Sequence, residues 1–547
     1  MVEQVTRGAR IAVGAVALLA LSVSVFGQDV SAPGTGGRLP GQQAAQAAGT
    51  PVVKKLSVDD AVQMALEQNL NLQVQRVNPR IQDLNIASVR TAWTPNVTSS
   101  LSNGSADSPS GNIFSGTGIT QTSDSLAWNF GANQLLPTGG NYQVSWGSSR
   151  AKSNSLFDNI NPRLNSSLSA SFTQPLLRNF RIDNTRQQLQ ISRKNREISD
   201  VQLRETVLGT IRNVKSAYWT LSYSVSSLKV QEQSLDLANE SLRNNEARVR
   251  IGTMAPIDII QAQAEVASRE ESVIRAQAAV AQAEDSFRAL IMDPQTANFW
   301  EMKFELTDSP TFEAQSVDVD AAVRKALDAR TDLVQQKKTI EENDITLRYM
   351  ANQTRPDVNV NVKYGVSAQG GTALAYDYSN VLNPVFLGQL GAVGYASMFK
   401  SLLKNDYPQW SFALTFGYPI GNSTAEANLV RARLQYGQAQ TQLRAAELTV
   451  VTQVRDAARQ VMTNQKRVES TRASRELQEK KLEAEQKKFA AGMQTTFFVL
   501  QAQRDLAQAR DLELSAILDY TRSLVDFETV QQAPTFGGSG GGITIGG

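Results

Sequence analysis

Cysteine and histidine are both absent from the 547 residues of the chain. Without cysteine the chain has no disulfide, no thiolate metal site and no cysteine that could carry a lipid anchor. Without histidine it lacks the residue that proteins use most often as a general base and as a metal ligand. We therefore expect no catalytic site, no metal site and no cofactor. An enzyme built on this sequence would have to work with carboxylates alone, and no pair of acids suggests such a site.

Net charge and long apolar runs are also scarce. The 54 lysines and arginines nearly balance the 52 aspartates and glutamates, which leaves a net charge of +2. This balance gives no argument for a nucleic-acid partner, and we expect none. After residue 25 no segment reaches 18 consecutive apolar residues, so any further membrane insertion would require β-strands.

The N-terminus has the layout of a secretory signal. Two arginines precede an apolar run over residues 11–25, and Gly27 is a suitable cleavage edge. The run is short for a membrane anchor, which needs about 20 apolar residues. We predict a signal peptide at residues 1–27 and a flexible leader at residues 28–55.

A heptad pattern dominates residues 176–293. Apolar residues recur every seven positions, which keeps one seam of a helix against a partner. At 251–256 the pattern is interrupted, where Gly252 suits a helix end and Pro256 suits the first turn of the next helix. We predict a helical hairpin whose first helix, of roughly 60 residues, is ~90 Å long. The seam consists of Val207, Val214, Leu221, Leu228, Leu235, Leu242 and Val249, then Ile259, Val266, Val273, Val280 and Phe287.

The same order of segments occurs twice. A helix predicted from Ser57 to Ala92 matches the chain 261 residues further on, and the long hairpin matches the chain 240 residues further on. With the offset of 240 residues, Gly252 maps to Gly492. The heptad match fails where Leu235 maps to Arg475. These two matches indicate an internal duplication.

Between each short helix and each hairpin, apolar and polar residues alternate as in β-strands. These segments lie within about 95–174 and about 356–419, and aromatic residues at their ends suit a membrane interface. Their length is that of a tilted strand crossing a bilayer, although a soluble sandwich with one buried face has the same pattern. One chain has too few strands for a wide closed barrel, so membrane insertion predicts an oligomer.

In their order and duplication these segments resemble the outer-membrane efflux family typified by TolC. The resemblance covers about 56–530 and also rests on the junctions Thr94-Pro95 and Arg355-Pro356 and on the strand ends Gln174-Pro175 and Tyr418-Pro419. It implies a mainly α fold with membrane β, in which long coiled-coil helical hairpins and strand hairpins are duplicated and form a trimeric α/β-barrel tunnel.

The resemblance also sets domain limits. We expect efflux repeat 1 at 56–293, with its long hairpin at 176–293, and efflux repeat 2 at 317–532, with its long hairpin at 420–532. A connector at 294–316 joins them, and a disordered Gly-rich tail follows at 533–547.

The implied function is the exit duct of a tripartite efflux or type I secretion system. Such a homotrimer lies in the outer membrane of a Gram-negative-type bacterium with a large periplasmic portion. Its partners are outer-membrane lipid, a periplasmic adaptor protein and the inner-membrane pump that drives transport through the passive conduit. It is not an enzyme. A periplasmic coiled-coil adaptor or structural scaffold would also use long heptad hairpins, but it would not need the strands.

The resemblance assigns roles near the two hairpin turns. In the family, residues after the turn glycine line the periplasmic constriction, which places Asp258 there in the first repeat. Its counterpart is Phe498, with Phe497 beside it, and the next candidates are the matched glutamines Gln261 and Gln501. This set predicts a gate that is more apolar and attracts cations less than a ring of carboxylates would. The turns that would dock the adaptor comprise Gly252, Thr253, Pro256, Gly492, Met493 and Thr495.

Other interpretations of the gate residues remain open. Asp258 would also complement a helix dipole in the first turn, and the two phenylalanines could pack between the hairpins. The basic stretch from Lys480 to Lys488 is interpreted as a solvated helix face.

The chain departs from the family pattern in two respects. It cannot carry the N-terminal lipidated cysteine of many relatives. It also has an extra strand hairpin near residues 125–150, and the sequence leaves open whether that hairpin joins the barrel.

Overall fold

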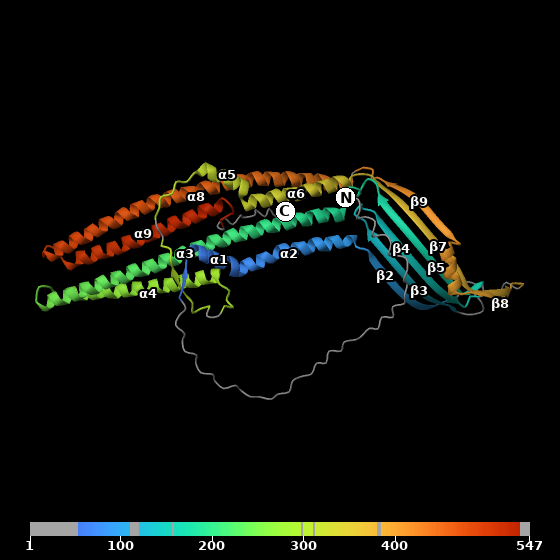
Figure 1. The fold of residues 1–547 in the computed structure, drawn as a ribbon, viewed down its shortest axis with the longest axis horizontal. Coiled ribbons are helices and arrows are strands. Elements are labelled where there is room, and N and C mark those ends of the chain that lie inside the picture. Colours follow the sequence, from blue (N-terminus) through green and yellow to red (C-terminus); the bar gives the residue numbers. More distant parts are fainter. Residues whose placement is uncertain are drawn as a thin grey trace, which may run out of the picture. The chain divides into compact units, whose positions relative to one another are not determined.

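The computed structural model describes residues 53–109, 120–155, 158–296, 299–309, 312–379, 384–421 and 423–535 (Figure 1). These residues belong to one compact unit, Pro51–Gly547. The predicted signal peptide, the leader up to residue 52 and the tail from residue 536 lie outside the described residues.

The helices and strands follow the predicted order in two halves. The first half contains β1 (Val53–Leu56), α1 (Val58–Gln68), α2 (Leu70–Arg90), the short 3₁₀ helix η1 (Thr91–Trp93), β2 (Asn96–Pro109), β3 (Thr120–Leu135), β4 (Asn141–Ser153), β5 (Ile160–Pro175), α3 (Asn184–Arg250) and α4 (Ile257–Ile291). The second half contains β6 (Lys303–Leu306), α5 (Val319–Ala329), α6 (Thr331–Gln353), β7 (Asp357–Asp377), β8 (Val385–Val393), α7 (Tyr395–Lys404), β9 (Pro408–Gly417), α8 (Thr424–Ala490) and α9 (Thr496–Val530).

The two long hairpins have equal dimensions. Helices α3 and α8 each have 67 residues, and the return helices α4 and α9 each have 35. The N-caps also correspond at the offset of 240 residues. The Asp183 side chain accepts a hydrogen bond from the Arg186 amide, and the Ser423 side chain accepts one from the Glu426 amide. The first hairpin starts later than predicted, since the Asp183 cap fixes the helix start and residues 176–183 form a loop.

The helix predicted from Ser57 to Ala92 is divided in two. Ser57 is the expected N-cap and forms a capping box with Asp60. The helix then ends at Asn69, whose side chain accepts a hydrogen bond from the Leu72 amide and so starts α2. The Asn69 amide group also donates to the Leu290 carbonyl at the end of α4, over 2.9 Å. This contact ties the break to the return helix.

The second half has the same break with a different residue. Arg330, which corresponds to Asn69 in the frame of 261, separates α5 from α6 and is 1% exposed. Its guanidinium donates to the Val530 carbonyl at 3.3 Å and to Asp332 at 3.0 Å. Val530 corresponds to Leu290 in the frame of 240. Both halves therefore tie the helix break to the same point of the return helix.

A small parallel sheet crosses the predicted domain limits. Strand β1 pairs with β6 over four residues, so that the end of the leader is joined to the connector. The connector is therefore partly ordered, and Leu56 is buried in the core of the first half. At the C-terminal end, the Thr331 amide donates to the Gln532 carbonyl at 2.9 Å and Ala533 is 1% exposed, so order continues past the predicted limit of 532.

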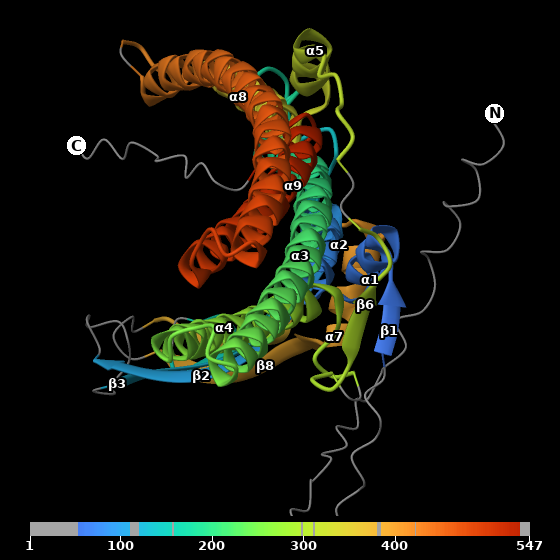
Figure 2. The same cartoon turned by 90° about the vertical axis from the view of Figure 1, so that its left-hand side faces the viewer.

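Helices α2 and α4 pack on successive stretches of α3, and the second half repeats this arrangement around α8 (Figure 1). Among the helices, the halves meet where α3 packs on α6 and α9, and in the sheet they meet where β5 pairs with β7. Viewed along its length, this layer is curved, with α1, α5 and the β1–β6 sheet on the convex side (Figure 2). Each of the predicted heptad positions of α3 and α4 is buried or half-buried.

An ion pair occupies the position at which the heptad match between the two halves fails. Arg475 bonds to Glu513 of α9 at 2.6 Å, and the side chains are 22% and 16% exposed. In the frame of 240, Glu513 corresponds to Val273, which is buried in the first half. The apolar positions Leu235 and Val273 are thus replaced together by two opposite charges.

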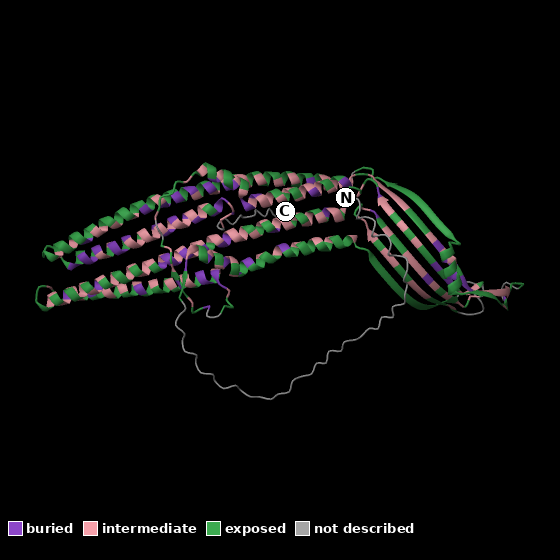
Figure 3. Ribbon diagram, viewed as in Figure 1, coloured by how far each residue is buried: buried purple, intermediate pink, exposed green. Residues whose placement is uncertain are grey.

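Seven of the described strands form an antiparallel sheet at one end of the helices (Figures 1 and 3). Its order is β2-β3-β4-β5-β7, and β7 then pairs with β9 along its first half and with β8 along its second half. The extra hairpin β3–β4 is inserted between β2 and β5, so it belongs to the sheet. The outermost strands β2 and β9 are exposed throughout.

Candidate functional site: two-faced sheet and hairpin tips

The pairing register divides the sheet into an apolar face and a polar face. Trp146 of β4 stands between Phe130 and Leu168 on the neighbouring strands, and Phe412 of β9 stands opposite Val362. Many of these side chains are exposed, including Phe412 at 63% and Leu168 at 42%. Since residues two apart share one face of a strand, the alternation in the sequence extends across the whole sheet.

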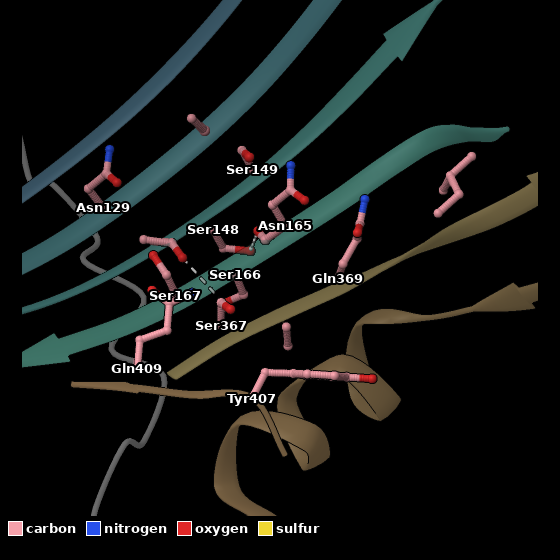
Figure 4. Close-up of a pocket in the computed structure, with 14 residues that line it drawn as sticks. Asn129, Ser148, Ser149, Asn165, Ser166, Ser167, Ser367, Gln369, Tyr407 and Gln409 are labelled. Carbon is pink, nitrogen blue, oxygen red and sulfur yellow. Dashed lines mark hydrogen bonds between the residues drawn. The ribbon is translucent and has the colours of Figure 1, made fainter. Parts of the chain in front are cut away.

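The opposite face is a wall of small polar side chains. It borders an open hollow of about 770 Å³. The residues of this face that line it are Asn129, Gly147, Ser149, Asn165, Ser167, Ser367, Gln369 and Gln409, and Ile160 and Tyr407 also contribute. Asn129, Asn165 and Gln369 project to the same side from three different strands (Figure 4). A surface of this kind stays hydrated and offers hydrogen bonds without binding one sign of charge.

Charged side chains on the polar face are few. By register Lys363 of β7 and Arg163 of β5 lie on this face, and Arg163 faces Asp158 at 3.7 Å. Asp357, at the first residue of β7, bonds to Arg178 in the loop before α3. Among the described strand residues, the middle of this wall carries no carboxylate. The lining is therefore close to neutral, with a small positive excess.

The two hairpin turns have the same backbone geometry. Gly252 and Gly492 adopt φ of 77° and 72°, values that suit glycine. The next residue in each turn donates its amide to a carbonyl five residues back, from Thr253 to Arg248 and from Met493 to Lys488, each at 2.9 Å. These are Schellman motifs. All six predicted docking residues are exposed, namely Gly252, Thr253, Pro256, Gly492, Met493 and Thr495.

The predicted gate residues lie in the first turns of α4 and α9. Phe497 and Phe498 are 52% and 47% exposed and contact each other edge to face, with ring centroids 5.6 Å apart. Within the second hairpin the buried contacts come instead from Val499 and Leu500. Thus both phenylalanine rings remain accessible to solvent in a single chain.

The polar members of the predicted gate are also accessible. Asp258 is half-buried, whereas Gln261 and Gln501 are exposed. The Gln501 amide donates to Asp505 at 2.7 Å, and Asp505 also pairs with Lys481 at 2.8 Å. This lysine belongs to the basic stretch 480–488, whose lysines are all exposed.

Two contacts join the hairpins near their tips, and sequence reasoning missed both. The Arg248 guanidinium lies over the Phe489 ring, 4.4 Å from its centroid. Arg504 of α9 approaches Glu265 of α4 at 3.8 Å, and Glu265 also holds Arg269 at 2.7 Å. The partners are more than 200 residues apart, and heptad spacing carries no signal for such pairs.

In the described part of the chain, no group of three or more acidic side chains could hold a metal ion. None of its helices is both long enough and apolar enough to cross a bilayer.

Comparison with known proteins decides the family. The family model for outer membrane efflux proteins matches residues 138–291 and 322–530, which together are more than half of the chain. The chain belongs to the outer membrane efflux protein family. The two matched segments fall in the two halves described above.

Solved structures of outer-membrane channels and outer-membrane proteins share this fold. The CmeC outer membrane channel of Campylobacter jejuni is 13% identical with a TM-score of 0.59, over 87% of this chain and 85% of that one. VceC of Vibrio cholerae is 13% identical with a TM-score of 0.58, over 87% and 96%. The open MtrE channel of Neisseria gonorrhoeae is 16% identical with a TM-score of 0.59, over 87% and 89%. A search of curated proteins finds no match to this chain.

Proposed function

We propose that this efflux protein is the exit duct of a tripartite efflux or type I secretion system. Three copies form a tunnel through the outer membrane and the periplasm. Members of the family are conduits rather than enzymes, and transport here is driven by an inner-membrane pump through a periplasmic adaptor. The proposal includes an export signal at residues 1–27 and efflux repeats at 56–293 and 317–532.

The two-faced open sheet carries this proposal. Its outer face exposes large apolar side chains that water would not favour but lipid would, and its inner face is polar. Among the strands that the structure describes, none pairs with the outer edge of β2 or of β9. Free edges are not tolerated in a lipid environment, because their amide and carbonyl groups need partners.

Strand direction supports closure between copies. Along the order β2-β3-β4-β5-β7-β9 every neighbouring pair is antiparallel, so β2 and β9 run in opposite directions. When β9 of one copy meets β2 of the next, the new pair is antiparallel as well. Because β8 and β9 share the place beside β7, each copy contributes six strands around the ring, and three copies close a barrel of 18 strands. This number is found in porins with aqueous lumens.

The hairpin tips supply the proposed gate and the adaptor site. The exposed turns at Gly252 and Gly492 form the docking surface. Asp258, Gln261, Phe497, Phe498 and Gln501 line the constriction, where half-exposed aromatic rings from three copies can meet. This gate is less attractive to cations than a carboxylate ring would be.

The test is planar-bilayer conductance of the purified protein together with its mass in the same detergent. The proposal expects a complex of three chains that gives small, discrete openings. A water-soluble protein without channel activity would overturn it, and would favour a periplasmic adaptor or scaffold instead.

A further inference from the structure

Helix α7 (Tyr395–Lys404) lies across the apolar face of the sheet. Met398 and Leu402 are buried, at 3% and 6% exposure, against Leu164 of β5 and against Val366 and Ala368 of β7. The Tyr395 ring lies 5.5 Å from Trp128 of β3, by centroids. The helix therefore crosses β3, β4, β5 and β7 on the face that the proposed function turns toward lipid.

The exposed surface of α7 is divided into strips by its helical period. Phe399 and Leu403 form one flank and remain 49% and 73% exposed, although they are large and apolar. Lys400 and Lys404 point away from the sheet, and Ser397 and Ser401 form the other flank. A helix in water gains nothing from the exposure of Phe399 and Leu403.

The apolar flank faces the middle of the apolar band. Phe399 contacts Trp146 edge to face, with centroids 6.3 Å apart. Trp146 pairs with Phe130, which lies two residues nearer the helical end of β3 than Trp128 does. Along β7 the apolar band runs from Val358 to Val366, about 26 Å at ~3.3 Å per residue. Helix α7 thus lies at the outer limit of a band of membrane thickness.

Beyond α7 the same face of the sheet becomes charged. By register Arg150 and Lys152 of β4 lie on the apolar face past the level of Trp128, and both are exposed. Asp124, opposite Lys152, bonds to the Ser105 hydroxyl at 2.6 Å. Within the described residues, no ion pair is found for Arg150, Lys152, Lys400 or Lys404. On the same face by register, Asp107 and Asp124 oppose these charges, so this rim, formed by those four basic residues, keeps an excess of positive charge that attracts phosphate.

We propose that α7 is an interfacial helix that binds the anionic headgroups of membrane lipid. Phe399 and Leu403 contact acyl chains, while Lys400 and Lys404 extend to the lipid phosphates. This inference rests on the proposed function, because it requires the apolar face to lie in a bilayer. The apolar flank of α7 continues the apolar face of the sheet, and the rim beside it is basic. Both features favour lipid over a soluble partner.

A single-thiol label tests the depth of α7, since the chain has no cysteine of its own. Leu403→Cys carries a nitroxide in trimers reconstituted into vesicles of phosphatidylcholine and phosphatidylglycerol. We expect collisions with oxygen to exceed those with a water-soluble nickel chelate at this site. The matched control Leu512→Cys on α9, which is 45% exposed, should show the opposite order. A water-like result at Leu403 in conducting trimers overturns the inference and leaves the duct intact.

Native mass spectrometry tests the headgroup contact. The trimer should retain phosphatidylglycerol in preference to phosphatidylcholine, and K400Q/K404Q should weaken that retention roughly 25-fold, about fivefold for each lysine. The control K466Q/K480Q removes two exposed lysines of α8 and should change nothing. Millimolar inorganic phosphate should not compete, because it lacks acyl chains. Equal retention by the wild type and K400Q/K404Q, or loss to free phosphate, overturns the lipid assignment. Absence of trimers and conductance would instead refute the proposed function.

Discussion

Arg475 and Glu513 show how one position of a heptad seam can change character without loss of the helix pair. The first half has Leu235 and Val273 at the corresponding positions, and the second half has an ion pair at 2.6 Å. The sequence shows that the seam fails at Arg475. It cannot show the partner, because Glu513 lies on another helix and its match to Val273 is a second, separate exception.

The pair makes a prediction by double substitution. Arg475→Leu leaves the mostly buried Glu513 without its partner and should lower the free energy of unfolding by about 3 kcal/mol. Adding Glu513→Val should restore most of that loss, since the pair then matches the first half. Thermal unfolding followed by circular dichroism at 222 nm measures both. Arg459→Leu, which breaks the exposed ion pair with Asp456, serves as the control. It should change the stability little. Additive losses in the double variant would contradict the compensation.

Glu342 of α6 provides a prediction of pH dependence. Burial raises the pKa of the Glu342 carboxyl, and its Oε1 atom has no hydrogen-bond partner among the described residues. A raised pKa means that the folded chain holds this proton at higher pH than the unfolded chain. The stabilising contribution is therefore complete below the usual carboxyl range and is lost as pH rises through the folded pKa.

Glu342→Gln removes this dependence. The variant should melt at a higher temperature than the wild type at pH 7, whereas the difference should shrink toward pH 4. The comparison is made between the two proteins at each pH, so that other titrating groups cancel. A difference that stays constant with pH would mean that Glu342 is not the group responsible.

At the level of elements, the sequence predicts the long hairpins well and their interruptions poorly. Heptads, Gly252 and Gly492 define both hairpins, since each feature acts within one segment. The breaks at Asn69 and Arg330 are harder to predict, because neither glycine nor proline marks them. They are stabilised by carbonyls at the ends of α4 and α9, more than 190 residues away. Helix α7 is too short for a periodic signal and depends on the sheet beneath it.

The hairpin tips carry a prediction about gating. The half-exposed Phe498 ring is proposed to narrow the tunnel, so Phe498→Ala should increase single-channel conductance and the sensitivity of the host to antibiotics. Leu512→Ala, an exposed apolar truncation further along α9, should have no effect. The apolar gate fails as an idea if both variants conduct like the wild type.

At the level of the whole molecule, the hairpin β3–β4 widens the sheet. Its position could not be read from the sequence, since alternation predicts strands but not their neighbours. The structure inserts it between β2 and β5 with continuous pairing on both sides.

Deletion of residues 120–153 should therefore leave a shorter but closable sheet. Strands β2 and β5 then become neighbours in an antiparallel hairpin, and three copies close 12 strands in place of 18. In a Phe498→Ala background, the largest polymer that enters the pore should shrink, because barrel diameter grows with strand number. The mass in detergent should still be that of three chains. An unchanged polymer cut-off, or loss of the complex, would contradict this view of the hairpin.

The even number of strands between the two free edges has a consequence for how such a pore can change size. Adding one strand would turn β9 parallel to the next copy's β2 and spoil the alternation around the ring. Adding a hairpin preserves it. In a ring of three copies, the circumference can therefore grow only in steps of six strands. Pore width in this architecture therefore changes in discrete steps. The smallest step is one inserted hairpin of about 30 residues in each copy.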